Sequence, residues 1–207
     1  MTIIIFSALI LGLLTGRWAL SVEAKPILDA VLMNALAVMV FCAGTDIGNS
    51  KNIVRKFLTI KTLGLSILVT VITNLGSMGG GILFGMLCGV PVGQSLLVSS
   101  GMGWYSLSSV VLSSSVGTEL GTLAFIANAL RELLTILAVP LLSRYCTLPL
   151  VVIGGATSMD STMPVLLECA GRPVAIMGFV NGFILSLEIP LLFSLLLTPA
   201  VRSLLGL

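Results

Sequence analysis

Seven apolar segments separated by short polar stretches occupy most of this 207-residue chain. They cover residues 2–20, 28–47, 62–87, 94–116, 120–142, 149–168 and 173–200. A helix rises about 1.5 Å per residue, so roughly 20 apolar residues cross the ~30 Å hydrocarbon core of a membrane. The mean hydropathy is +1.19, and only 9% of the residues are charged. The sequence therefore predicts an all-α, multi-pass membrane protein whose residues 1–207 form a single transmembrane domain.

Several function classes do not fit this composition. The net charge is only +2 and the basic residues form no continuous face, so a nucleic-acid partner is not expected. The chain has no histidine and its four cysteines are isolated from one another, so we expect neither a metal site nor a cofactor. An intramembrane hydrolase is disfavoured, because the histidine of a catalytic triad and the paired acids of an aspartyl protease are both missing. The sequence predicts a membrane protein that is not an enzyme.

The fourth and sixth segments differ from ordinary membrane helices. Residues 99–117 (SSGMGWYSLSSVVLSSSVG) and 154–164 (GGATSMDSTMP) are dense in Gly, Ser and Thr. Backbone that leaves the helical conformation at membrane depth must be satisfied by protein or by a water-filled cavity, and hydroxyl groups suit both. We expect two broken or re-entrant helical hairpins; the alternative is a pair of tightly packed helices that use small-residue contacts.

The basic residues indicate an orientation. A cluster between the second and third segments marks the cytoplasmic side by the positive-inside rule, and it contains Lys51, Arg55, Lys56 and Lys61. If all seven segments cross the membrane, the basic residues are divided almost evenly between the two sides. If the fourth and sixth segments return to the side from which they enter, the bias increases. This pattern favours five crossings, with the N-terminus inside and the C-terminus outside.

Asp160 is the most informative single residue. An ionised carboxylate at the bilayer centre costs about 2.5–3.5 kcal/mol on insertion scales, so an acid there is by default a functional residue. Thr157 and Ser158 place hydroxyl groups beside it, and Pro164 ends or kinks any helix that it interrupts. The segment therefore predicts a ligand-binding turn. In the alternative interpretation, Asp160 only caps the half-helix that follows.

A second polar group follows helical spacing in the fifth segment. Asn128, Arg131 and Glu132 lie at positions i, i+3 and i+4, so they share one face of a helix. That face must contact a cavity or another helix. Arg131 could form an ion pair with Glu132 or Asp160, whereas Asn128 and Glu132 are better placed as ligands.

Two further regions add polar candidates. In the seventh segment, Asn181 precedes Glu188, which is either an ion ligand or an anchor between helices. In the fourth segment, Tyr105 and Ser106 either line a site or belong to an interfacial aromatic anchor. The predicted substrate- or ion-binding residues are Asp160, Asn128, Glu132, Thr157, Ser158, Tyr105, Ser106, Asn181 and Glu188.

These features are typical of a secondary transporter. Such proteins bind substrates and ions near the bilayer midplane at the ends of discontinuous helices, which offer free N–H and C=O groups. Carboxylates in that position would bind an ammonium group or a proton. The residues themselves do not identify the substrate.

Four stretches resemble the lysine exporter (LysO-like) family: SGMGWYSLSSVVLSSSVG at 100–117, ANALRELLTILAVPLL at 127–142, GGATSMDSTMPVLLECAGRP at 154–173 and VNGFILSLEIPLL at 180–192. The resemblance implies antiport that exports L-lysine, or an analogue such as thialysine, across the bacterial inner membrane. It implies a proton, or else sodium, as the coupling ion. In this scheme Asp160 attracts the substrate ammonium or exchanges a proton, Glu132 is a nearby acid and Asn128 is a neutral ligand.

The chain departs from this family in two ways. Longer members carry further residues before the matching region, so the chain resembles their C-terminal two-thirds. This implies either a homodimer or a complex with a small partner subunit, and an accessory subunit without transport activity of its own is the alternative. Where members have an Asn-Asp pair before Arg-Glu, this sequence reads ANALRE, so the acidic position falls on Asn128. That change bears on proton coupling and on the preference for a cationic substrate.

Overall fold

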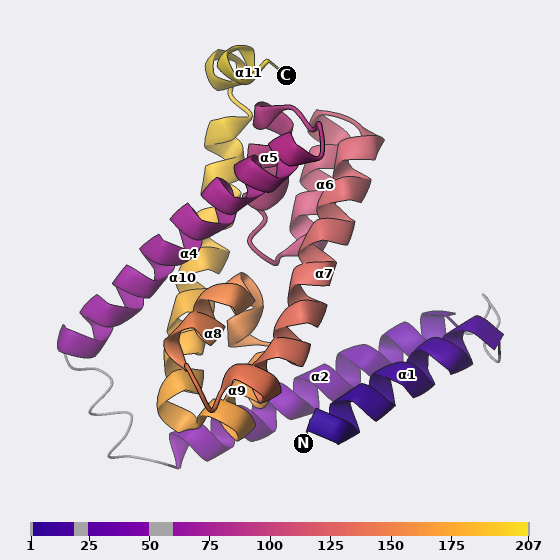
Figure 1. The fold of residues 1–207 in the computed structure, drawn as a ribbon, viewed down its shortest axis with the longest axis vertical. Coiled ribbons are helices and arrows are strands. Elements are labelled where there is room, and N and C mark those ends of the chain that lie inside the picture. Colours follow the sequence, from indigo (N-terminus) through magenta and orange to yellow (C-terminus); the bar gives the residue numbers. More distant parts are fainter. Residues whose placement is uncertain (1, 19–24, 50–59, 207) are drawn as a thin grey trace.

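The computed structural model describes residues 2–18, 25–49 and 60–206, and every regular element in these residues is a helix (Figure 1). The predicted all-α membrane fold is confirmed. Three helices are long and apolar enough to cross a membrane: α4 (Ile60–Leu87), α7 (Thr118–Leu142) and α10 (Arg172–Leu196). Followed along the chain in Figure 1, α4 and α10 run upward and α7 runs downward, so successive long helices alternate in direction.

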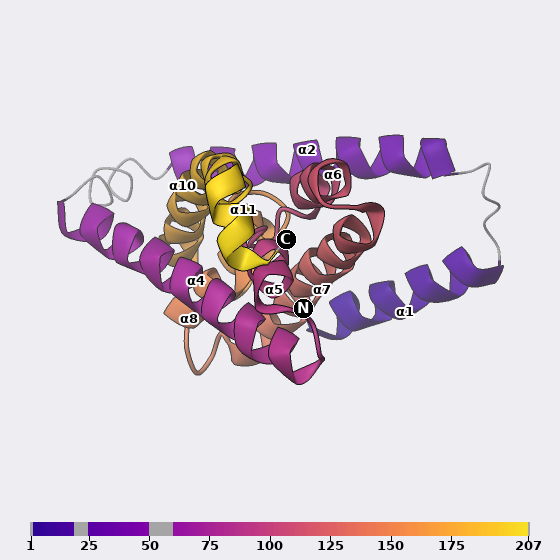
Figure 2. The ribbon, with the colours of Figure 1, turned by 90° about the horizontal axis from the view of Figure 1, so that it is seen from above.

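The first two predicted segments are also helices, α1 (Thr2–Trp18) and α2 (Lys25–Gly48). α1 contacts α7 and α2 contacts α9, and both extend beyond the bundle on one side (Figures 1 and 2). Large apolar side chains such as Trp18 and Phe41 are exposed on them, as expected for helices that meet lipid. The predicted basic cluster at 51–56 lies outside the described residues, as does the side chain of Lys61.

The fourth predicted segment is interrupted. It consists of α5 (Val92–Ser99) and α6 (Tyr105–Ser115), joined by a turn at residues 100–104. We call residues 92–115 the first hairpin. Met102 and Gly103 have φ angles of +45° and +100°, which an α-helix does not allow, so the helix ends before them.

The sixth predicted segment is interrupted as well. It consists of α8 (Leu148–Gly154), a short 3₁₀ helix η2 (Gly155–Met159) and α9 (Met163–Ala170). We call residues 148–170 the second hairpin. Pro164 lies in the first turn of α9, where its missing N–H has no helical partner to lose. It therefore begins a helix, whereas the sequence suggested that it would end or kink one.

The seventh predicted segment is shorter than expected. The apolar segment covers 173–200, but α10 ends at Leu196 and a separate short helix, α11 (Pro199–Leu205), follows. Pro199 explains the break, because the residue before a proline is driven out of the α conformation. Thr198 accordingly has an extended backbone, with φ −61° and ψ 144°.

The two hairpins enter the bundle from opposite ends, and their tips meet near its middle (Figure 1). The Ala156 N–H donates a 2.9 Å hydrogen bond to the Met102 carbonyl. A side chain on Gly103 would lie 3.2 Å from the Gly154 carbonyl, and one on Gly155 would collide with the Met102 carbonyl. The tips therefore touch backbone to backbone, which only glycine at these positions permits.

Each hairpin has its own apolar core. Around the first hairpin, Leu97 and Leu112 pack with Phe193 of α10. Around the second, Leu150 and Leu166 form a separate cluster with neighbouring helices. Met102 and Ala156 of the tips belong to the first cluster, so the tip junction is packed among apolar side chains.

Candidate functional site

A cavity of about 440 Å³ lies beside the junction of the two tips. The first hairpin contributes residues 103–106 and the second contributes residues 156, 157 and 159–161. Glu132 of α7, Ser186 of α10 and Ala37 of α2 complete the wall. Because five separate parts of the chain form this cavity, a movement of either hairpin would change its shape.

Two carboxylates face this cavity. Asp160 is exposed to it, and the Ser161 N–H and hydroxyl donate to its Oδ1 at 2.6 and 3.2 Å. Ser161 also contacts the carboxylate of Glu132, which comes from the middle of α7. No side chain caps the N-terminus of α9, so Asp160 does not have the capping role that the sequence left open. The two acids are thus connected through Ser161 in one cavity.

Arg131, the residue before Glu132, is bound elsewhere. Its Nε donates to the Ile153 carbonyl at 2.8 Å and its Nη2 to the Val152 carbonyl at 2.9 Å, and Nη1 donates to the hydroxyl of Ser77. These carbonyls end α8, where the helix dipole is negative and favours a cation. Within the described part of the chain, Arg131 forms no ion pair with a carboxylate. The ion pair with Glu132 or Asp160 that the sequence suggested is not seen.

The cavity is therefore acidic in composition. Among the described residues that line it, none is Lys or Arg. Aromatic groups also line it: Trp104 and Tyr105 both face the cavity, and the Tyr105 ring packs edge-on against Phe125 with centroids 5.4 Å apart. The cavity brings together these predicted site residues: Tyr105, Ser106, Glu132, Thr157 and Asp160.

Three of the remaining predicted residues are buried at the hairpin tips. The Asn128 Oδ1 accepts the Gly103 N–H at 2.8 Å, and its Nδ2 donates to the Val98 carbonyl at 3.1 Å. Ser158 and Asn181 are both 0% exposed, and the Asn181 Nδ2 donates to the Ser158 hydroxyl at 3.4 Å. All three side chains bind protein groups, and none lines the acidic cavity.

Glu188 lies on another face of α10. Its Oε2 accepts a 3.0 Å hydrogen bond from the Asn74 Nδ2 of α4, whereas Ser186, two residues earlier, lines the cavity. The Asn74 Oδ1 is buried and has no hydrogen-bond partner. Glu188 is thus separated from the two cavity acids by the width of its own helix.

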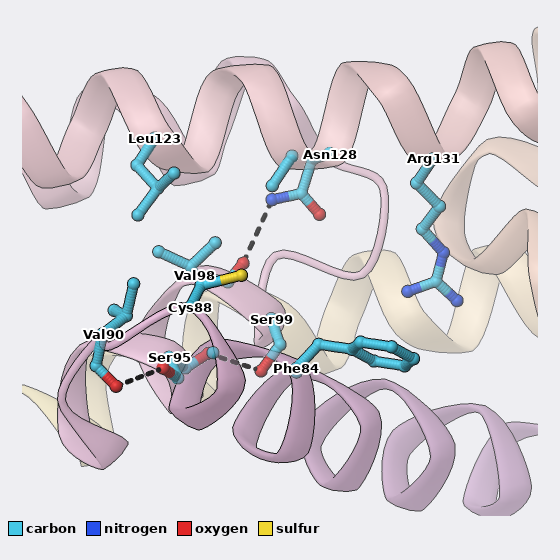
Figure 3. Close-up of a pocket in the computed structure, with 12 residues that line it drawn as sticks. Phe84, Cys88, Val90, Ser95, Val98, Ser99, Leu123, Asn128 and Arg131 are labelled. Atoms are coloured by element: carbon cyan, nitrogen blue, oxygen red, sulfur yellow. Dashed lines mark hydrogen bonds between the residues drawn. The ribbon is translucent and has the colours of Figure 1, made fainter.

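A second cavity, of about 330 Å³, lies between α4, α5 and α7 (Figure 3). Asn128 and Arg131 project toward it from α7, and most of its other lining side chains, such as Phe84 and Leu123, are apolar. Among the described residues around it, none is Asp or Glu. Its chemistry does not match a cationic ligand.

Two serines of the cavity were not among the predicted site residues. Ser161 is a neighbour of Asp160 in sequence, and the signal was its position in the GATSMDST motif. Ser186 is a small polar residue in an apolar helix, and its hydroxyl contacts the Met159 sulfur at 3.3 Å. No spacing in the sequence connects Ser186 with Asp160, so only the folded chain reveals that they share a cavity.

Known proteins are similar to this chain in sequence. A family model described as "Lysine exporter LysO" matches residues 6–197. "Lysine exporter LysO" of Escherichia coli (strain K12) is 34% identical over 159 residues, which are 77% of this chain and 52% of that protein. "Putative lysine exporter" of Haemophilus influenzae is 30% identical over 188 residues, 91% of this chain and 94% of that protein. No solved structure matches the chain.

The matched region thus spans about half of the Escherichia coli relative and nearly all of the Haemophilus influenzae relative. The family match runs through both hairpins and all three long apolar helices. The chain belongs to the lysine exporter LysO family and is a multi-pass protein of the inner membrane.

Proposed function

We propose that this chain exports L-lysine, or a close analogue such as thialysine, across the inner membrane. The observation that supports this function best is the cavity with two carboxylates, Asp160 and Glu132, and no described basic residue in its wall. A negative cavity at a helix break attracts an ammonium group and repels anions. The names of the two relatives point to the same substrate.

The cavity has groups for the side-chain ammonium and for the aliphatic chain of lysine. The side-chain ammonium would bind Asp160 and Glu132, since hydrogen bonds between charged groups are stronger than neutral ones. The aromatic rings of Trp104 and Tyr105 would cover the aliphatic chain and add a cation–π contribution. The volume of the cavity, about 440 Å³, lies in the usual range for small-molecule sites, roughly 300–1,000 Å³.

Proton antiport follows from the same two acids. A carboxylate that binds a proton loses the charge that attracts lysine, so the two cations compete for Asp160 and Glu132. If the proton binds from outside and lysine from inside, the competition couples their movements in opposite directions. Sodium is the alternative coupling ion, because a carboxylate can bind it in the same way.

The two hairpins would gate this cavity. We propose that both are re-entrant: each enters and leaves the membrane on the same side, and their tips separate the cavity from the two aqueous phases. Asn128, Ser158 and Asn181 would act by stabilising the tips, and Thr157, Tyr105 and Ser106 would contact the substrate. Glu188, which accepts a hydrogen bond from the neutral Asn74, is a second candidate for an ion ligand.

The test is efflux of labelled lysine from vesicles that contain only the purified protein. An acidic exterior should accelerate efflux from the wild type, and Asp160→Asn should abolish this acceleration. Glu119→Gln is the matched control, because it removes one exposed acid from the first turn of α7, away from the cavity.

Undiminished, pH-responsive efflux from the Asp160→Asn variant would contradict the proposed mechanism. A sodium gradient in place of the pH gradient separates the two coupling ions. Absence of efflux from the wild type alone, with recovery when a small membrane partner is co-expressed, would instead support the accessory-subunit alternative. Cross-linking of the purified protein tests for a homodimer.

A further inference from the structure

Two consecutive parts of the chain have the same architecture. Residues 92–142 form a short helix, a turn, a second short helix and a 25-residue helix, α7. Residues 148–196 form the same series, which ends in a 25-residue helix, α10. Gly117 precedes α7 and Gly171 precedes α10, and both have a positive φ. The two parts are therefore built to one plan, although few of their residues are identical.

The two parts run in opposite directions. In Figure 1, α7 descends from the end where the first hairpin begins, and α10 rises from the end where the second hairpin begins. Each long helix packs against its own hairpin: α7 contacts α5 and α6, while α10 contacts η2 and α9. This is the arrangement of an inverted repeat, which relates two halves by a rotation about an axis in the membrane plane.

An asparagine occupies the matching place in both long helices. Asn128 is the eleventh residue of α7 and Asn181 is the tenth residue of α10. Asn128 bonds the tip of the first hairpin through Gly103 and Val98. The Asn181 Nδ2 donates to the Gly155 carbonyl at 3.3 Å in the tip of the second hairpin. Each side chain is at most 4% exposed, so both are committed to these contacts.

The tips also touch at matching positions. Asn181 follows Asn128 by 53 residues, and Ala156 follows Gly103 by the same interval. The same interval of 53 residues matches Met102 with Gly155. The hydrogen bond from the Ala156 N–H to the Met102 carbonyl therefore joins a residue of one matched pair to a residue of the other. Contact between equivalent residues is what a two-fold axis through the junction requires.

We propose that residues 92–142 and 148–196 are two copies of one unit in inverted orientation, and that Asn128 and Asn181 are its matched positioning residues. Each asparagine fixes its hairpin tip at the axis, and transport proceeds when the two units exchange conformations. The break of the second unit is longer, at 155–162, and contains Asp160, while the short helix that follows it is shorter: α9 has 8 residues and α6 has 11. The repeat thus forms the frame, and the longer break supplies one of the two cavity acids.

The first experiment measures on which side of the membrane the connections lie. It uses three variants with one cysteine each: native Cys88 after α4, native Cys146 after α7, and Glu168→Cys near the end of α9. An impermeant thiol reagent is applied to right-side-out and inverted vesicles. We expect Cys88 to react from one side, and Cys146 and the position-168 variant to react from the other. Reaction of Cys88 and Cys146 from the same side would mean that the first hairpin crosses the membrane, and it would overturn the inverted repeat.

The second experiment compares Asn128→Ala with Asn181→Ala in lysine efflux, and this comparison rests on the proposed function. A positioning role predicts that each variant lowers the maximal rate by about tenfold or more, because small displacements at a site are costly. The half-saturating lysine concentration should stay within about twofold, since neither side chain contacts the substrate. The controls are Thr122→Ala and Ser194→Ala, which are exposed and bond only their own helices.

The outcomes separate the alternatives. A large rise in the half-saturating concentration for either asparagine variant would make that residue a ligand and overturn the positioning role. Loss of rate in one variant with no effect in the other would show that the positions are not equivalent. The labelling experiment uses no lysine, so it decides the inverted orientation even if efflux of lysine is not observed.

Discussion

Asn128 and Arg131 lie one turn apart on α7, and their side chains bind different hairpins. Asn128 accepts the Gly103 N–H of the first hairpin, whereas Arg131 donates to the Val152 and Ile153 carbonyls at the end of α8 in the second. The next residue, Glu132, reaches the acidic cavity. A single turn of α7 therefore bonds both hairpins and fixes their positions relative to Glu132. Because Arg131 is bound to helix-end carbonyls, the carboxylates of the cavity have no basic partner among the described residues that line it.

Replacing Arg131 should destabilise the protein. Arg131→Gln leaves the two α8 carbonyls and the Ser77 hydroxyl short of donors, and unsatisfied buried groups cost about 1–3 kcal/mol each. We expect a clearly lower midpoint of thermal unfolding in detergent. Arg144→Gln, which removes an exposed guanidinium beside Tyr145, should change stability by about 0.5 kcal/mol or less. Equal midpoints for the two variants would contradict the role given to Arg131.

Gly155→Ala should prevent the tips from meeting. Its Cβ would collide with the Met102 carbonyl at a residue whose φ is +62°. Gly171→Ala is the matched control, because Gly171 also has a positive φ, +87°, but its Cβ would meet only Pro173 at 3.9 Å. Both variants carry the backbone strain, so the additional loss of efflux in Gly155→Ala measures the tip contact. Similar efflux from both would show that close contact of the tips is not required.

Glu188 and Glu132 should differ in their effect on substrate affinity. Glu132→Gln removes a charge from the cavity, and we expect the half-saturating lysine concentration to rise by about tenfold or more. Glu188→Gln should leave that concentration within about twofold, because Glu188 faces Asn74 on α4 and a glutamine oxygen can still accept its hydrogen bond. Concentration dependence of efflux is the measurement. A similar increase for both variants would place Glu188 on the substrate path.

Two serines on α6 provide a test of the cavity itself. Ser106 lines it and is exposed, whereas Ser108 is 0% exposed beneath Asn128. In a background without the native cysteines, Ser106→Cys should react with a water-soluble thiol reagent and lysine should slow the reaction. Ser108→Cys should react much more slowly, and lysine should not affect it. Protection by lysine at 108 but not at 106 would place the substrate in a different cavity.

The sequence predicts the long helices and the breaks for a clear physical reason. Gly, Ser and Thr accumulate where the backbone must leave the helix, and this composition is local in the chain, so 99–117 and 154–164 stand out. The importance of Asp160 is also local, because an acid in an apolar segment needs no partner to be noticed. The groups that Asp160 faces, by contrast, come from distant parts of the sequence. Glu132 lies 28 residues earlier, and only the junction of the hairpins brings the two acids to one cavity.

Helical spacing did not reveal which groups Asn128, Arg131 and Glu132 each contact. Spacing places them on one face of α7, but the face is wide enough for neighbouring side chains to reach different structures. A hairpin tip covers Asn128, and the carbonyls that end α8 bind Arg131. The sequence does not show which backbone carbonyls at a helix end are free to accept hydrogen bonds. The partner expected for Arg131 was therefore a carboxylate, and Asn181, which also donates to a backbone carbonyl, was expected to be a ligand.

Lysine binding to the purified protein tests the central claim most directly, because it requires neither a gradient nor a known orientation. Titration calorimetry would compare the wild type with a variant that carries both Asp160→Asn and Glu132→Gln, and with the Glu119→Gln control. We predict saturable binding of L-lysine to the wild type and the control. In the double variant we predict affinity weaker by about tenfold or more, a loss of at least 1.4 kcal/mol. Unchanged affinity in a double variant that unfolds at the wild-type temperature would contradict the assignment of the acidic cavity as the lysine site.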